Sequence, residues 1–380
     1  MTAVPENLCV MPWIAVDRNR NSKNKITSLT PCCLYEFSDS QTNINEYWNS
    51  DEIIRLRKDM QENKRPAGCN KCWKHEDQGV ESLRQSINKG RLKQFQHILS
   101  ETVLTQSPSQ IKYTPGTECN LSCRMCLPNF SSRVEKLYDI IGIPYENQKD
   151  NLLNNFEYII QNKQNIRFLD ISGGEPFYHK KTKQLLLNLI ESGDNKHITL
   201  FVTTNATRID AVTVKLLKQF EDVVLSISLD GVGKVHEYIR PGCNWEQLEN
   251  NIKLLKRNKI SLQIISTISV LTILNLTELE EWCSQNNLHF ANPSIVTNPI
   301  ELAPHNLPYQ LHQFVPKKYK NFIKKEISHD SLNFIKTLDD YWKTDIVEAI
   351  PQWKHVVDNL HWRTQKQLNH LNEVAKNYVG

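Results

Sequence analysis

The sequence of 380 residues predicts an α/β protein built around an open, partial barrel of six βα units. Between residues 111 and 300, short runs rich in β-branched and aromatic residues alternate with longer amphipathic segments. The six runs begin near residues 111, 166, 197, 222, 262 and 288. Strands that alternate with helices at this spacing form right-handed βα units and hence a parallel sheet. We therefore expect a partial (β/α)6 TIM-like barrel, in which ligands bind where the loops after the strands converge.

The segments on either side of the barrel region have a different character. Residues 1–80 contain a predicted hairpin around the polar turn at 18–25 and a helix over 50–63. Two acids, Asp51 and Glu52, lie in the first turn of this helix, where they suit the helix dipole. Residues 81–110 predict a helix and a Ser/Pro-containing linker. Strand character is lost after residue 300, so residues 301–380 are expected to form a helical C-terminal extension.

Composition narrows the class of protein. A chain with 39% hydrophobic residues can bury a substantial core, and a net charge of +4 is too mild to indicate nucleic-acid binding. No stretch approaches the length of a membrane span, and the N-terminus lacks the features of a signal peptide, so we expect a cytoplasmic protein without a membrane partner. Cytosolic thiols stay reduced; the ten cysteines, eight of them before residue 127, therefore indicate metal binding.

Three of these cysteines lie in one loop directly after the first predicted strand of the barrel. Cys119, Cys123 and Cys126 have the spacing C-x3-C-x2-C, which lets a tight loop turn three thiolates toward a common centre. No His lies between residues 98 and 178, and the next cysteine is Cys243, so a zinc site closed by four nearby ligands is disfavoured. If the loop holds a four-iron cluster, one iron has no protein ligand and is open to an outside molecule.

This loop resembles the signature of the radical S-adenosylmethionine (radical SAM) superfamily. Further motifs follow later strands in that family's order, namely SGGEP at 172–176, TTNAT at 203–207 and SISLDG at 226–231. The resemblance implies that the three cysteines hold a [4Fe–4S] cluster whose open iron chelates SAM. One-electron reduction in such enzymes splits SAM into methionine and a 5′-deoxyadenosyl radical.

The resemblance also implies which side chains bind the cofactor. Glu175 offers an acceptor for the amino group of SAM, and the two preceding glycines let the backbone approach a ligand. Ser228 and Arg240 resemble the pair that holds the cofactor's carboxylate, which a guanidinium meets bidentately. No catalytic residue is assigned. The predicted cofactor-binding residues are Met125, Gly173, Gly174, Glu175, Pro176, Asn205, Ser228, Asp230 and Arg240.

The other early cysteines predict a second metal centre. Cys9, Cys69, Cys72 and one of Cys32 and Cys33 can together supply four thiolates, because adjacent side chains in a strand face opposite ways. Their layout resembles the Twitch and SPASM auxiliary-cluster modules of radical SAM enzymes, although in most relatives the module follows the barrel. The resemblance implies an auxiliary [4Fe–4S] cluster in a small hairpin/helix domain and favours Cys32, whereas a zinc ribbon with the same ligands is the alternative.

The sequence thus predicts an enzyme whose radical abstracts hydrogen from a peptide or small metabolite, leading to oxidation, crosslinking or epimerisation. An electron donor such as flavodoxin or ferredoxin is the implied partner. Two alternatives are radical modification of a nucleic acid, guided by the Lys-rich C-terminal helices, and a non-catalytic iron–sulfur electron-transfer or binding protein. The substrate is expected to enter near Asn205, Asp230, His236 and residues 292–299, whereas Cys243 and Cys283 are expected to be ordinary buried thiols.

Overall fold

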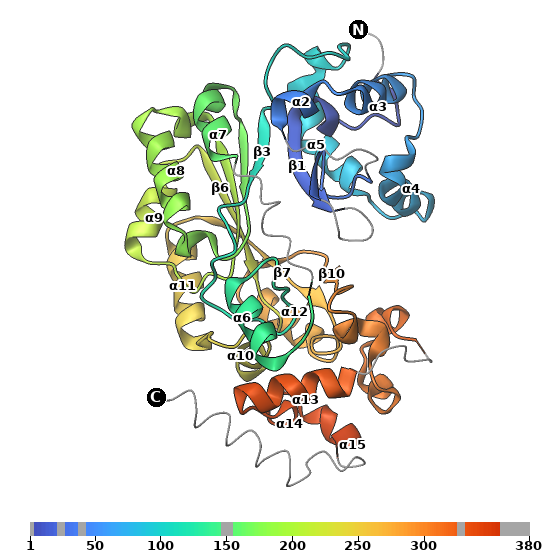
Figure 1. Ribbon diagram of the computed structural model, residues 1–380, viewed down its shortest axis with the longest axis vertical. Helices are drawn as coiled ribbons and strands as arrows, with labels where there is room; N and C mark the ends of the chain where they lie inside the picture. The colour runs from blue at the N-terminus through green and yellow to red at the C-terminus, as the bar shows by residue number, and fades with distance from the viewer. Residues whose placement is uncertain (1–3, 21–26, 37–42, 146–154, 325–330, 358–380) are drawn as a thin grey trace.

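The computed structural model describes residues 4–20, 27–36, 43–145, 155–324 and 331–357. Its centre is an eight-stranded sheet in the order β2-β1-β3-β4-β5-β6-β7-β9 (Figure 1). Strands β1 and β2 pair antiparallel, and every other neighbouring pair in this sheet is parallel. The prediction of a mostly parallel α/β fold is confirmed. The strands are β1 (Ala15–Arg20), β2 (Thr27–Thr30), β3 (Gln110–Tyr113), β4 (Phe168–Ile171), β5 (Thr199–Thr204), β6 (Asp222–Ser228), β7 (Ser261–Ile265) and β9 (His289–Phe290).

Helices cover the outer face of this sheet, as Figure 1 shows for the green and yellow segments. Neighbouring strand residues Ile111, Leu169 and Leu200 are fully buried and belong to the core between sheet and helices. Because side chains alternate along a strand, the next residues, Lys112 and Asp170 among them, face the inner side of the barrel. The helices that follow successive strands are α7 (Phe156–Asn162), α8 (Lys180–Glu191), α9 (Ala211–Leu217), α11 (Trp245–Arg257) and α12 (Leu276–Gln285).

The N-terminal segment joins the barrel sheet directly. Strand β1 pairs in parallel with β3, with Ala15 opposite Gln110 and Val16 opposite Ile111. The predicted hairpin therefore extends the sheet beyond the first strand of the barrel. The residues just before β1 form a helical turn, with a proline in its first turn, where proline is well tolerated. The helices of this segment are α1 (Met11–Ile14), α2 (Ile44–Trp48), α3 (Asp51–Gln61), α4 (Asn70–Asp77) and α5 (Leu83–Phe95). Of these, α1, α2, α3 and α5 share a separate core with β1.

The segment after the barrel packs against α6 (Ser132–Ile141) and α10 (Lys234–Ile239) in a third core. The short strands β8 (Thr267–Ile268) and β10 (Ser294–Ile295) form a second, two-stranded parallel sheet. Beyond it follow 3-10 turns, then α13 (Ser331–Trp342), α14 (Ile346–Ala349) and α15 (Lys354–Val357). The helical extension is present through residue 357, and the remainder of the predicted extension, residues 358–380, lies outside the described residues. No helix within the described ranges is long and apolar enough to cross a membrane.

Candidate functional site

The cysteine loop and the carboxyl ends of three neighbouring strands enclose a cavity of about 240 Å³. Cys119, Cys123 and Cys126 all line it. Predicted residues from five separate stretches of sequence thus surround one space. Pro176 differs, because it lines another cavity on the far side of its loop. The predicted cofactor residues that line the cysteine cavity are Met125, Gly173, Gly174, Glu175, Asn205, Ser228, Asp230 and Arg240.

Backbone contacts fix the cysteine loop on the turn that follows α10. The Ser122 N–H donates to the Pro241 carbonyl at 3.1 Å, and the Arg124 N–H donates to the Ile239 carbonyl at 2.9 Å. The Arg124 side chain is buried; its Nε donates to the Tyr238 carbonyl at 2.7 Å, and its Nη2 lies 2.9 Å from Asp339 Oδ1 on α13. The loop is therefore anchored both to the barrel and to the C-terminal helices.

The two glycines of the SGGEP motif let its loop approach the cysteine loop. Gly174 has φ +54°, and a Cβ at this position would lie 2.1 Å from the Glu118 carbonyl oxygen. The next residue donates its N–H to that same carbonyl at 2.9 Å. Because Glu118 directly precedes the first cysteine, these glycines set the spacing between the two loops as well as any contact with a ligand.

Glu175 is buried and joins two strand ends. Its Oε1 accepts from the Thr204 hydroxyl at 2.6 Å and from the Phe177 N–H at 3.2 Å, and its Oε2 accepts from the Asn205 N–H at 2.7 Å. Burial raises the pKa of this carboxyl, and the three hydrogen bonds oppose that rise. Since a carboxylate offers about four lone-pair positions, Glu175 can still accept from a ligand ammonium group.

Arg240 is paired in the structure with Asp230. Its Nε and Nη2 lie 2.7 and 2.6 Å from Asp230 Oδ2, while Nη1 is 3.7 Å from the sulfur of Cys123. Burial opposes the charge on Arg240, but Asp230 and Cys123 outweigh it and raise the pKa of the guanidinium. Ser228 and Arg240, which are predicted to hold the cofactor's carboxylate together, both line the cavity, and Asp230 is the carboxylate bonded to the arginine in the structure.

Some residues that line the cavity were not predicted from the sequence, and His236 lies elsewhere than predicted. Thr203 and Thr204 line the cavity, and the only signal for them is their position directly before Asn205 at the end of β5. His236 was expected near the substrate entrance, but it is buried, does not line the cavity, and accepts the Asp230 N–H on Nδ1 at 3.2 Å. Burial lowers the pKa of this imidazole well below its ordinary value, so it is neutral near pH 7.

Four other cysteines surround a second, smaller cavity of about 20 Å³ in the N-terminal segment. Cys9, Cys32, Cys69 and Cys72 line it together with Arg84, whereas Cys33 is exposed and does not. The Arg84 guanidinium lies 2.6 Å from Glu76 Oε2 and donates to the Leu8 carbonyl at 2.9 Å. Each cysteine cavity therefore has an arginine at its wall, Arg240 in the barrel and the buried Arg84 here, and its charge offsets negative charge from thiolates.

The donor sets suit iron–sulfur chemistry. Soft thiolates favour iron–sulfur clusters, zinc and copper over hard cations. Among the residues that the structure describes, no group of three or more His, Cys, Asp or Glu side chains is arranged to hold a single metal ion. A four-iron cluster takes one thiolate at each corner, so its ligands stand farther apart than those of one ion. The cysteines that line the two cavities supply the thiolate donors that clusters of this kind require.

A partial parallel barrel with a three-cysteine loop and a GGEP loop at its carboxyl rim defines a radical SAM domain. Residues 113–284 match the family described as the Radical SAM superfamily, and this part of the chain belongs to it. The expectation drawn from the sequence motifs is thereby confirmed at the level of the superfamily.

Two curated relatives match parts of the chain. The cysteine-type anaerobic sulfatase-maturating enzyme of Clostridium novyi (strain NT) is 25% identical over 241 residues, covering 58% of this chain and 59% of the relative. The radical SAM cyclopropyl synthase TigE of Paramaledivibacter caminithermalis is 27% identical over 168 residues, covering 43% of this chain and 35% of the relative. The chain thus spans less than two thirds of the length of either relative.

Solved structures show a distant likeness. The enzyme anSMEcpe with bound AdoMet has a TM-score of 0.39 and 19% identity, over 61% of this chain and 59% of that one. Streptococcus suis SuiB bound to its precursor peptide SuiA has a TM-score of 0.38 and 17% identity, over 83% of this chain and 69% of that one.

Proposed function

We propose that this protein is a radical SAM enzyme that cleaves SAM reductively and uses the resulting radical to abstract hydrogen from a peptide or protein substrate. The observation that carries the proposal is the single cavity lined by Cys119, Cys123 and Cys126 together with residues of three later motifs. A cluster bound by these three thiolates would supply the electron that splits SAM.

The side chains around the cavity have complementary tasks. Glu175, held by hydrogen bonds from Thr204 and Asn205 at the end of β5, presents an acceptor to the amino group of SAM. Asp230 holds the Arg240 guanidinium 3.7 Å from the Cys123 sulfur, where its charge stabilises a thiolate. Gly174 keeps the motif loop against the cysteine loop. These residues orient the cofactor and keep the reacting carbon in one place, which is the protein's task in cofactor chemistry.

The N-terminal cysteines, in this proposal, hold an auxiliary [4Fe–4S] cluster. Cys9, Cys32, Cys69 and Cys72 supply one thiolate for each iron, which leaves no open position for a ligand. Such a closed shell suits electron transfer or structural support. Flavodoxin or ferredoxin is the class of donor proposed to deliver electrons from outside.

A peptide or protein is favoured as the substrate by one comparison. The name of the Clostridium novyi relative states that it matures a sulfatase, so its target is a protein. The open rim of the barrel also lies beside a third cavity, lined by apolar side chains and by the cations Lys183 and Arg208.

Anaerobic reconstitution tests the proposal. We expect about eight irons in the wild type and about four in Cys119→Ala/Cys123→Ala/Cys126→Ala. Reduced wild type should release 5′-deoxyadenosine from SAM, and the triple variant should release none. The matched variant Cys9→Ala/Cys32→Ala/Cys69→Ala/Cys72→Ala should also hold about four irons yet still release 5′-deoxyadenosine. Full iron binding without any SAM cleavage would instead support the non-catalytic electron-transfer alternative.

A further inference from the structure

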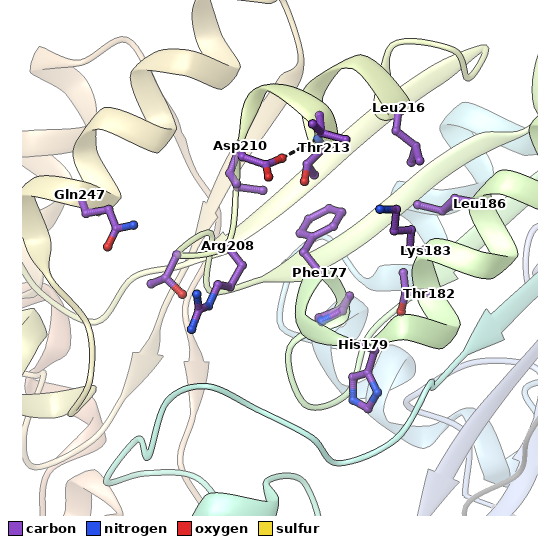
Figure 2. Close-up of a pocket in the computed structure, with 14 residues that line it drawn as sticks. Phe177, His179, Thr182, Lys183, Leu186, Arg208, Asp210, Thr213, Leu216 and Gln247 are labelled. Atoms are coloured by element: carbon purple, nitrogen blue, oxygen red, sulfur yellow. Dashed lines mark hydrogen bonds between the residues drawn. The ribbon is translucent and has the colours of Figure 1, made fainter.

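A third cavity, of about 360 Å³, lies between α8 and α9, on the outer side of the loops that border the cysteine cavity of the barrel (Figure 2). We call it the α8–α9 pocket. Glu175 lines the cysteine cavity, whereas Pro176 and Phe177 line this pocket. In the same way Asn205 faces the cysteine cavity and Arg208 faces the pocket. The same two loops therefore form a wall of both spaces.

Apolar and polar side chains both line the α8–α9 pocket. Its volume is within the range of ordinary ligand pockets. Large apolar side chains beside it are also open to solvent: Tyr178 is 44% exposed, Leu187 38% and Val212 62%. Clustered exposure of this kind marks a binding surface more than scattered single residues do. The apolar residues that line the pocket are Pro176, Phe177, Leu186, Ile209, Val212 and Leu216.

Two cations complete the lining. Lys183 projects from α8 and Arg208 from the loop after β5, and neither forms an ion pair with a described residue. The Arg208 guanidinium lies 5.5 Å from the ring of the exposed Tyr178, which orients it at the rim. The one carboxylate of the lining, Asp210, already accepts the Thr213 N–H at 2.7 Å as the cap of α9. This hydrogen bond lowers the pKa of Asp210 and Lys183 contributes more weakly, so Asp210 offsets part of the charge of Lys183. With two cations and one carboxylate, the lining keeps a net positive charge beside apolar side chains.

Buried polar atoms at the inner end of the pocket also lack partners. His179 Nε2 and Thr182 Oγ1 have no hydrogen-bond partner among the described residues, although both side chains line the pocket. Unpaired buried polar groups of this kind are costly and call for an explanation, such as a bound ligand or water. The other ring nitrogen of His179 lies 3.5 Å from Glu118 Oε2, directly before the first cysteine of the loop. A ligand in the pocket would thus contact the side chain that supports the cysteine loop.

We propose that the α8–α9 pocket docks a segment of the peptide substrate in which an acidic residue lies between apolar residues. The inference rests on the proposed function for the presence of a peptide, and on the pocket for the chemistry of its docking segment. Arg208 and Lys183 bind the carboxylate, and the apolar walls bind the flanking side chains. Because the pocket shares its loops with the cysteine cavity, a peptide held here has its reacting residue close to the cofactor, which raises the effective concentration of that residue.

Fluorescence anisotropy on the full chain tests this docking site. The probes are a fluorescein-labelled hexapeptide of alternating leucine and glutamate, and the same peptide with glutamine in place of glutamate. We expect the glutamate peptide to bind at least about tenfold more tightly than the glutamine peptide. Lys183→Glu/Arg208→Glu should remove that preference. Lys183→Gln/Arg208→Gln, which changes the surface less, should weaken it in the same direction.

The matched control is Lys181→Glu/Lys215→Glu, which makes the same change of charge on α8 and α9 at exposed positions outside the pocket. Equal binding of the two peptides to the wild type would overturn the docking proposal, as would an equal loss in the control variant. Release of 5′-deoxyadenosine by the wild type without peptide is measured in parallel. If it is absent, the proposed function fails, whereas a glutamate preference lost only in the pocket variants still supports the docking chemistry.

Discussion

The ion pair between Arg124 and Asp339 gives a quantitative test of how the cysteine loop is held. The Arg124 side chain has no exposed surface and Asp339 is 5% exposed, with 2.9 Å between Nη2 and Oδ1. Asp339→Asn removes the charge that compensates this guanidinium and leaves a buried cation unpaired. Breaking a buried pair from one side costs about 3–5 kcal/mol, and we expect a decrease of this size in the free energy of unfolding.

The assay is urea unfolding under anaerobic conditions, followed by circular dichroism. Asp77→Asn is the control, because the Arg65–Asp77 pair is shorter, at 2.6 Å, but its side chains are 45% and 59% exposed. This control should unfold like the wild type, since exposed pairs contribute little. Replacing both partners, as in Arg124→Met/Asp339→Leu, leaves no unpaired charge and should therefore lower the free energy of unfolding less than Asp339→Asn alone. An unchanged urea midpoint for Asp339→Asn would refute the assignment of this pair as the anchor.

Three further predictions concern single positions in the two cysteine sites. Gly174→Ala should destabilise the protein by at least about 2 kcal/mol, because the new Cβ meets a backbone oxygen. Gly193 also has a positive φ, but a Cβ there would have no atom within 4 Å, so Gly193→Ala should destabilise the protein less; thermal unfolding measures both. Cys32→Ser should lower the iron content of the N-terminal site, whereas Cys33→Ser should leave it unchanged, and iron analysis distinguishes them. In Glu175→Gln, an amide NH2 group replaces one carboxylate oxygen and faces another hydrogen-bond donor, so the free energy of unfolding in urea should fall by about 1–3 kcal/mol. An unaltered urea midpoint would show that these hydrogen bonds do not hold the two strands.

The barrel could be predicted from the sequence because its signals are local. Each strand from β3 to β7 is a short apolar run, and each following helix has its own periodicity. The motif residues were found for the same reason: they directly follow strands, and parallel strands bring their carboxyl ends to one rim. Eight of the nine predicted cofactor residues line the same cavity, and Pro176 does not because the chain turns outward after Glu175.

Pairings between distant segments were not predictable from those signals. Nothing local in β1 indicates that it pairs with β3, since a strand pattern shows which face is buried and not which neighbour it has. Asp230 and Arg240 were both selected, but their pairing depends on how α10 returns the chain to the rim. The extension after residue 300 is expected to be helical, but its Lys317–Phe322 stretch is a 3-10 segment, a form used in short connecting pieces.

The parallel contact between β1 and β3 has a consequence for how the protein is divided. An isolated barrel that begins at residue 111 would have β3 as an uncovered border, with backbone donors and acceptors free to pair with another molecule. The N-terminal segment therefore also seals the sheet against association. A truncated chain should aggregate even though every residue of the radical SAM domain is present.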